Sequence, residues 1–226
     1  EGEYAQEDIN PIPNVVPGLR EWVGLEGSFI VDADTRIVAE SEDAYQAALQ
    51  LRSYLSEMSD ISVEIVREGA REGDIVLNQD ATLSDELDEE GYLIHVGDQI
   101  VIDAPAYIGL LYGGVSISQI LYQDEMHARV PKGIIRDYPE YSVRGGMHDV
   151  ARKYFSLDYI EEMGRYMAWF KLNTLHLHIN EDSGLGGEYS SSFVVESKKY
   201  PQLNTYNGEY VWSQDDYRQM QKDLKK

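Results

Sequence analysis

Two short stretches carry most of the side chains that could do chemistry. In segment 175–182, polar and apolar residues alternate before two acids follow, Leu-His-Leu-His-Ile-Asn-Glu-Asp. A strand that alternates in this way has one polar face, which carries His176 and His178, and one apolar face. Inside a barrel the polar face would line the interior, and Glu181 and Asp182 would lie at the C-terminal end of the strand. Barrel active sites form at that end, so this segment is a candidate site.

The second stretch begins with Arg144, which stands directly before a Gly-Gly pair. We expect segment 141–145 to be a strand with Arg144 near its C-terminal end, where it would converge with the acids on one rim. A guanidinium there offers a planar fork of donors to vicinal hydroxyls or a carboxylate. The glycines allow backbone or ligand to approach closely. The alternative is a structural arginine that pairs with Asp149 or Asp182 to hold the rim.

A helix is predicted between the two stretches. Ser156 can cap a helix over 157–172, and Asn173 can close it. The strand 174–180 follows and would run parallel to the first strand. Strand, helix and strand within about 40 residues form a βαβ unit. The apolar stripe of this helix is Ile160, Met163, Met167 and Phe170.

The first part of the chain shows a different pattern. Residues 1–11 read as a flexible lead-in, and 12–138 as a small α/β domain before a linker at 137–140. Helices are predicted over 41–59 and 106–122. The runs 28–31 and 36–39 are expected to form a hairpin, as is the segment 91–103. We expect helices on one face of a mainly antiparallel sheet, and residues 139–226 to open a barrel. The fold class is α/β.

Composition narrows the classes of function. The formal charge is −22, so nucleic acid and anionic membranes would repel the chain. No apolar run approaches the roughly 20 residues that span a bilayer, which predicts no membrane insertion. The absence of cysteine rules out disulfides and thiolate metal sites. Residues 1–10 are polar and acidic, unlike a signal peptide, although a signal could have been removed.

Taken together, the motifs resemble the opening of the catalytic domain of glycoside hydrolase family 20, the β-N-acetylhexosaminidases and lacto-N-biosidases. The resemblance rests on Arg-Gly-x-x-x-Asp-x-Ala-Arg-x-Tyr at 144–154 and Lys-x-Asn-x-Leu-His-Leu-His-x-x-x-Asp at 171–182. The runs 197–203 and 210–213 are similar to the family's loop into its second barrel helix. Residues 12–138 resemble the small α/β domain that precedes the barrel in many of these enzymes.

The resemblance implies a retaining hydrolase that removes terminal N-acetylhexosamine, or a disaccharide that contains it, from glycans. Catalysis would be assisted by the substrate, whose acetamido oxygen attacks the anomeric carbon. One Asp orients that group, and the Glu next to it protonates the leaving oxygen. No metal or organic cofactor is implied. A bacterial protein that is secreted or held at the cell surface is expected.

Residue roles are carried over position by position. Arg144 matches an arginine that binds sugar hydroxyls. Glu181 stands where the family usually has an Asp that supports the catalytic acid through a histidine, and Asp182 matches the second acid of that pair. Two further sets are expected to support the site: the strand histidines His176 and His178, and the rim residues Asp149 and Arg152.

The sequence also departs from the family pattern. Glu181 is one methylene longer than the usual Asp, and Ser-Gly-Leu-Gly-Gly follows Asp182 in place of Gln-Gly-Trp, which keeps the lacto-N-biosidase branch open. The catalytic Asp-Glu pair is expected beyond Lys226, because a barrel takes about 250 residues and only about 86 follow the linker. We therefore expect a truncated barrel that is inactive alone and can associate with itself through its open edge.

Two other classes remain open. The chain could be a non-catalytic scaffold or a glycan-binding module. Alternatively, His176 and His178 could bind a divalent ion in a metal-dependent barrel hydrolase, which would need further ligands from later strands. That scheme gives no role to Arg144.

Overall fold

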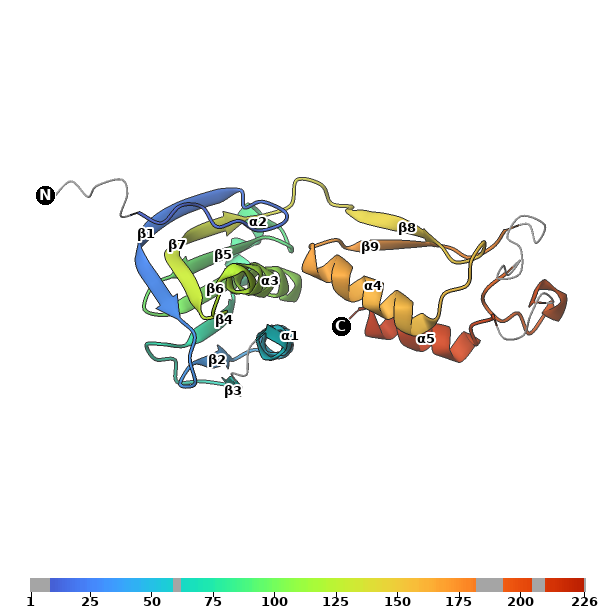
Figure 1. Cartoon of the computed structure of the whole chain (residues 1–226), viewed down its shortest axis with the longest axis horizontal. Helices are drawn as coiled ribbons and strands as arrows, with labels where there is room; N and C mark the ends of the chain where they lie inside the picture. Colours follow the sequence, from blue (N-terminus) through green and yellow to red (C-terminus); the bar gives the residue numbers. More distant parts are fainter. Residues whose placement is uncertain (1–8, 59–61, 182–192, 205–209, 226) are drawn as a thin grey trace, which may run out of the picture. The chain divides into compact units, whose positions relative to one another are not determined.

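The computed structural model describes residues 9–58, 62–181, 193–204 and 210–225. The chain folds into two compact units, which comprise residues 1–140 and 141–226 (Figure 1). The division follows Glu140, the last residue of the predicted linker.

Unit 1 is built on one seven-stranded sheet. Its strands are β1 (Glu21–Ile30), β2 (Arg36–Ala39), β3 (Glu64–Val66), β4 (Ile75–Gln79), β5 (Tyr92–Val96), β6 (Ile100–Ala104) and β7 (Arg129–Asp137). Their order across the sheet is β1-β7-β5-β6-β4-β2-β3. The predicted hairpin of β5 with β6 is confirmed. The expected pairing of 28–31 with 36–39 was wrong, because β1 pairs with β7 while β2 lies between β3 and β4.

The sheet is mixed. The pairs β1–β7, β7–β5 and β5–β6 are antiparallel, whereas β6–β4, β4–β2 and β2–β3 are parallel. The α/β class is therefore confirmed, but the expectation of a mainly antiparallel sheet was wrong. For β2 and β3 the cause is the crossover through the helix at 42–58, since a connection through a helix brings the chain back in the same direction.

Two long helices, α1 (Glu42–Met58) and α3 (Tyr107–Gln123), lie side by side on one face of this sheet (Figure 1). The short helices η1 (Ala81–Leu83) and α2 (Ser84–Leu87) connect β4 to β5. The predicted cap of α1 is confirmed, since Ser41 Oγ accepts a hydrogen bond of 3.1 Å from the Ala44 amide. A Cβ on Gly113 would come within 2.5 Å of Ile102 Cγ2, so this glycine lets α3 pack closely against the sheet.

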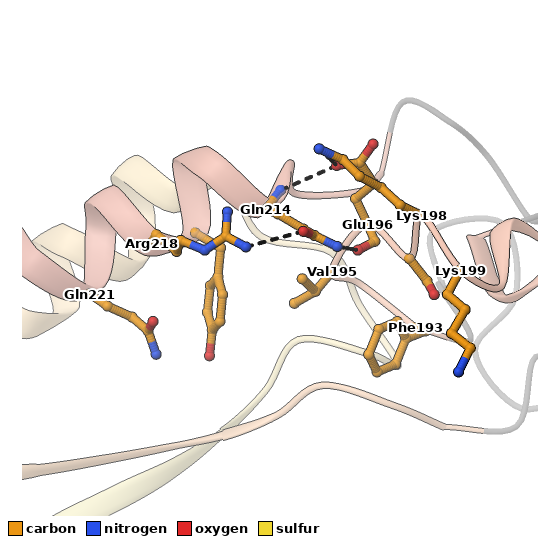
Figure 2. Close-up of a pocket in the computed structure, with 10 residues that line it drawn as sticks. Phe193, Val195, Glu196, Lys198, Lys199, Gln214, Arg218 and Gln221 are labelled. Atoms are coloured by element: carbon orange, nitrogen blue, oxygen red, sulfur yellow. Dashed lines mark hydrogen bonds and ion pairs between the residues drawn. The ribbon is translucent and has the colours of Figure 1, made fainter.

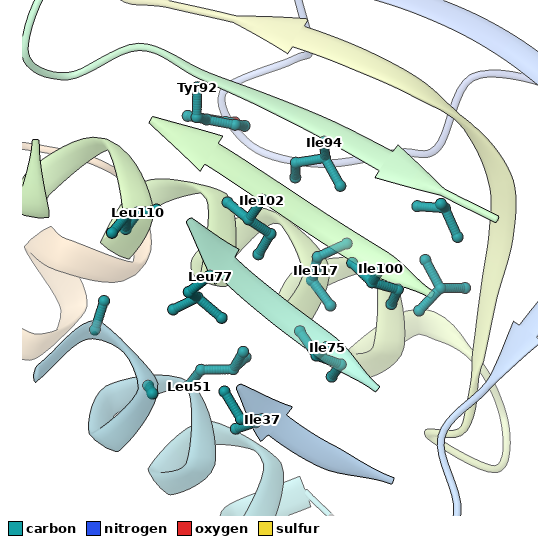
Figure 3. Packing of buried hydrophobic residues seen from close by; sticks show 14 of the residues in the cluster. Ile37, Leu51, Ile75, Leu77, Tyr92, Ile94, Ile100, Ile102, Leu110 and Ile117 are labelled. Carbon is teal, nitrogen blue, oxygen red and sulfur yellow. The ribbon is translucent and has the colours of Figure 1, made fainter. Parts of the chain in front are cut away.

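The core of unit 1 lies between these helices and the sheet (Figure 3). Every second residue of a strand points to the same face, so each central strand contributes alternate apolar side chains. Burying one such side chain stabilises the folded state by about 1.5–3 kcal/mol. The fully buried members include Ile37, Leu51, Ile75, Ile94, Ile100, Ile102, Leu110 and Ile117.

A buried ion pair stabilises the edge of this core. The Asp74 carboxylate has no exposed side-chain area and accepts from Arg36 Nε at 3.1 Å and Nη2 at 2.6 Å. The Arg71 amide donates to it at 2.8 Å. Burial alone would raise the pKa of Asp74, but the hydrogen bonds from Arg36 and Arg71 outweigh that effect and hold the pKa below its ordinary value.

Unit 2 contains the strands β8 (Gly145–Asp149) and β9 (Thr174–His178), which form a two-stranded parallel sheet. Its helices are α4 (Leu157–Trp169), η3 (Pro201–Asn204) and α5 (Gln214–Asp223). The predicted βαβ unit is thus confirmed, as is the cap of α4, where Ser156 Oγ accepts from the Tyr159 amide at 3.3 Å. Within the ranges described above, no helix combines the length and apolar character needed to cross a bilayer.

Asn173 has a different role from the predicted helix closure. α4 ends earlier, and Lys171 takes a left-handed conformation with φ of 55°. Asn173 Oδ1 accepts from the Arg144 amide at 3.0 Å, and its Nδ2 donates to Ser142 O at 2.9 Å. The asparagine therefore joins the segments that lead into β8 and β9. The small core of unit 2 consists of Val150, Ile160, Val194, Trp212 and Met220, with partly buried neighbours.

Candidate active site

Four predicted site residues meet where β8 and β9 end. Asp149 and His178 are the last residues of their strands and are register partners. Arg152 follows β8, and Glu181 follows β9. Arg152 Nη1 lies 2.6 Å from Asp149 Oδ2, and Arg152 Nη2 forms an ion pair with Glu181 Oε2. We call Asp149, Arg152, Glu181 and His178 the rim network.

The acid at the end of β8 is held in place by its own loop. Asp149 Oδ1 accepts from the Ala151 amide at 3.1 Å and the Arg152 amide at 3.0 Å. Burial alone would raise the pKa of Asp149, but the hydrogen bonds from Arg152 and Ala151 lower it below its ordinary value. The hydrogen bond to Asp149 raises the pKa of Arg152. Both groups are therefore charged at neutral pH, and the loop after β8 has a fixed geometry.

The acid at the end of β9 has two neighbours within the rim network. Only 19% of the Glu181 side chain is exposed, and the Arg152 guanidinium contacts one carboxylate oxygen. His178 Nε2 lies 3.5 Å from the same Glu181 oxygen but 2.7 Å from the Asn180 carbonyl oxygen. A carbonyl oxygen only accepts, so His178 Nε2 carries a hydrogen and donates it to Asn180. The closer neighbour of Glu181 is therefore the arginine.

Arg144 lies at the other end of the strands, and its expected place was wrong. β8 begins after Arg144, and Gly145 pairs with Thr174, so the arginine stands where both strands start. The rise of about 3.3 Å per residue puts it roughly 13 Å or more from the rim network. Its Nε donates to Lys171 O at 3.0 Å and its Nη1 to Tyr141 O at 2.8 Å.

The physical reason for the position of Arg144 is that the residues before it lack a partner strand. The segment 141–144 has no strand partner among the described residues, so the strand starts four residues later than predicted. The convergence of Arg144 with the acids on one rim is not found, whereas the predicted parallel direction of the strands is confirmed. The role of Arg144 in sugar binding stays a prediction from the family resemblance.

The remaining predicted residues give less information. His176 is exposed on β9, and Asp182 lies outside the described residues. Within the described ranges there is no group of three His, Cys, Asp or Glu side chains that could hold a metal ion. The metal-hydrolase alternative therefore finds no ligand set in this part of the chain.

A separate surface hollow of about 450 Å³ lies between α5 and the segment 193–199 (Figure 2). Two of its cations contact acids, Lys198 with Glu196 at 4.0 Å and Arg218 with Asp215 at 2.7 Å. No rim-network residue contributes to it. Its lining is Phe193, Val195, Glu196, Ser197, Lys198, Lys199, Gln214, Tyr217, Arg218 and Gln221.

Sequence reasoning missed two features of this region. The first is that one arginine contacts both rim acids; the spacing of three residues from Asp149 to Arg152 signals only the nearer pair. The second is His148, whose ring packs on Phe155 and Tyr159 with centroids 4.5 and 5.7 Å apart. Its Nε2 is buried and has no hydrogen-bond partner among the described residues.

Known proteins resemble this chain in sequence. The β-hexosaminidase of Vibrio furnissii is 29% identical over 180 residues, which cover 79% of this chain and 27% of that protein. The lacto-N-biosidase of Bifidobacterium bifidum is 30% identical over 169 residues, 74% of this chain and 15% of that protein. This chain therefore spans about a quarter or less of the length of these relatives.

The fold is also found in solved structures. The N-acetyl-β-hexosaminidase of Streptomyces plicatus in complex with Thio-NAglucal matches with a TM-score of 0.81 at 21% identity, over 96% of this chain and 44% of that one. The sequence profile of glycosyl hydrolase family 20, domain 2, matches residues 12–138, and that of the family's catalytic domain matches residues 141–224. The chain therefore belongs to glycosyl hydrolase family 20.

Proposed function

We propose that this chain is a fragment of a retaining exo-glycosidase that removes terminal N-acetylhexosamine from glycans. The observation that carries the proposal is the rim network, which lies at the strand ends where barrel enzymes place their active sites. The relatives support the substrate class: they include β-hexosaminidases, and a variant of the Streptomyces plicatus enzyme is described in complex with GlcNAc as product.

The chemistry proposed is substrate-assisted hydrolysis, in which the acetamido oxygen of the sugar attacks the anomeric carbon. The residues described in this chain would support that reaction rather than carry out the bond cleavage. Arg152 and Asp149 fix the loop after β8, while Glu181 presents a carboxylate that could accept a hydrogen bond from a neighbouring group. The Asp and Glu that orient the acetamido group and protonate the leaving oxygen would come from a longer protein.

The test compares the 226-residue chain with the longer protein that we propose contains it. Both are assayed with chromogenic β-glycosides of N-acetylglucosamine and N-acetylgalactosamine. The longer protein should release the chromophore and the 226-residue chain should not. Turnover by the pure 226-residue chain would contradict the proposal that the reacting Asp and Glu come from the longer protein. No turnover by the longer protein on any N-acetylhexosaminide would contradict the proposed function.

A second candidate is release of the disaccharide lacto-N-biose, because one relative is a lacto-N-biosidase. A chromogenic lacto-N-bioside separates the two. A disaccharide-releasing enzyme would cleave it in one step and leave the simple N-acetylglucosaminide intact, whereas a hexosaminidase would show the opposite preference.

Two further properties belong to the same proposal. Among the described residues β8 and β9 pair only with each other, so each has an edge with unpaired backbone groups that could recruit another strand. We expect the isolated chain to associate with itself, which sedimentation velocity at increasing concentration would detect; a monomer at every concentration would contradict this. Bacterial relatives support a secreted or cell-surface protein, and fractionation of the producing cells tests that location.

A further inference from the structure

The guanidinium of Arg152 spans the ends of two parallel strands. One of its nitrogens lies 2.6 Å from Asp149, at the end of β8, and the other contacts Glu181, after β9. We propose that Arg152 is a positioning residue for the reaction, which orients the Glu181 carboxylate. This inference rests on the proposed glycosidase function and assigns a role within that site.

The geometry explains why an arginine is needed. Each terminal nitrogen of the planar guanidinium serves a different carboxylate, so both acids are fixed relative to one rigid group. Asp149 is itself fixed by the Ala151 and Arg152 amides. Glu181 is thereby positioned from the backbone of the β8 loop, through two ion pairs. A lysine could supply the charge but not the fork.

The surrounding charges favour Arg152 over the histidine as the group that orients Glu181. His178 donates its Nε2 hydrogen to Asn180 O at 2.7 Å and is 3.5 Å from Glu181, longer than a hydrogen bond of good geometry. The charged or titratable groups of the rim network that face the Glu181 carboxylate are therefore Arg152 and His178, with Asp149 on the far side of the guanidinium. Half of the Arg152 side chain is exposed, so substrate or solvent can reach the pair.

The length of the glutamate side chain also fits this arrangement. Its two methylenes extend the carboxylate away from the backbone, and the Arg152 guanidinium is a group that it meets. Without that cation the flexible side chain would sample other rotamers.

The experiment uses the longer, active protein and measures kcat and KM for Arg152→Gln and Arg152→Lys. Arg152→Gln should lower kcat roughly ten- to a hundredfold, as expected for a misplaced group near the reaction, and leave KM within about twofold. Arg152→Lys should restore only part of kcat, because it returns the charge without the planar fork.

Arg218→Gln is the matched control, since Arg218 also pairs with an acid three residues away, at 2.7 Å on the surface of α5. It should change neither kcat nor KM. If Arg152→Gln lowers only the unfolding temperature and leaves kcat unchanged, the arginine is merely structural and the inference is wrong.

Should Arg152→Gln fail to fold, Glu181→Gln is measured alone and together with Arg152→Lys. Coupled losses in kcat support the inference, and additive losses overturn it. Wild-type activity separates the two proposals: an inactive wild type contradicts the glycosidase function, whereas an active wild type with unaffected Arg152 variants contradicts only the positioning role.

Discussion

The two units differ in how their sheets are completed. In unit 1, seven strands share one core with two long helices, and the central strands have neighbours on both sides. In unit 2, the described strands form a single pair, and five of the described residues make up the buried core cluster. The candidate site lies in unit 2, at the ends of this strand pair. The larger apolar core and the candidate site thus lie in different units of the chain. Ion pairs hold the rim network in place, whereas apolar packing stabilises unit 1.

The largest expected effect tests this difference in packing. Ile102→Ala removes a fully buried side chain from unit 1 and should cost roughly 2–5 kcal/mol of unfolding free energy. Ile160→Ala, at an equally buried position in unit 2, should lie at or below the lower end of that range because its smaller core can relax into the cavity. Urea unfolding followed by tryptophan fluorescence measures both, with Trp22 in unit 1 and Trp212 in unit 2. Equal losses would contradict the comparison.

The next effect compares the two Asp–Arg pairs. Asp74→Asn should cost roughly 1.5–3 kcal/mol, since it weakens several charge-assisted hydrogen bonds of a fully buried carboxylate. Asp149→Asn should cost less, because 22% of that side chain is exposed. Both pKa values are lowered on folding, so each pair stabilises fully above the unfolded pKa of about 3.9 and progressively less as the pH falls through the folded pKa. The free energy of unfolding should change less between pH 2 and 7 in each variant than in wild type.

Substitution of two adjacent glycines should change stability by a smaller amount, with opposite signs at the two positions. Gly113→Ala would place a Cβ 2.5 Å from Ile102 Cγ2 and should cost about 1–3 kcal/mol through overpacking. Gly114→Ala meets Leu51 at 3.7 Å, an ordinary contact, and should stabilise α3 by about 0.5–1 kcal/mol through helix propensity. Thermal unfolding of the two variants measures the difference. A stable Gly113→Ala would mean that α3 is not held against β6 as tightly as the packing indicates.

The smallest effect concerns His148 in unit 2, whose buried Nε2 has no hydrogen-bond partner among the described residues. His148→Leu should stabilise the 226-residue chain by about 1 kcal/mol, because a buried polar atom without a described partner is replaced by an apolar group. His176→Leu, at an exposed position on β9, serves as the control and should change stability little. A loss of stability in His148→Leu would show that the ring has a polar partner in solution.

The sequence predicted the parts of the fold that depend on neighbours along the chain. Ser41 and Ser156 each precede a helix that they cap, the turn at Gly97 joins β5 to β6, and the segment 145–178 folds as a βαβ unit. These features arise from hydrogen bonds and periodicities that span fewer than about 40 residues, so local pattern is sufficient to find them.

The pairing of strands that lie far apart in the sequence was not predicted and is seen only in the tertiary structure. The turn at Asp32 forms, with the Thr35 amide bonded to Asp32 O at 3.3 Å, yet β1 pairs with β7 rather than with β2. The reason is that many strands of similar apolar pattern compete as partners, and burial against α1 and α3 chooses among them. The later start of β8 has a different cause, since residues 141–144 find no strand partner in the described part of the chain.

For the candidate site, the amino-acid sequence alone determined the residue types at the ends of β8 and β9, and with them the family. The tertiary structure decided which of them meet. The register of Asp149 with His178 brings Arg152 within reach of Glu181 and leaves Arg144 at the opposite end of the same strands. A shift of a few residues along a strand moves a side chain by about 3.3 Å per residue, and sequence spacing does not fix that register.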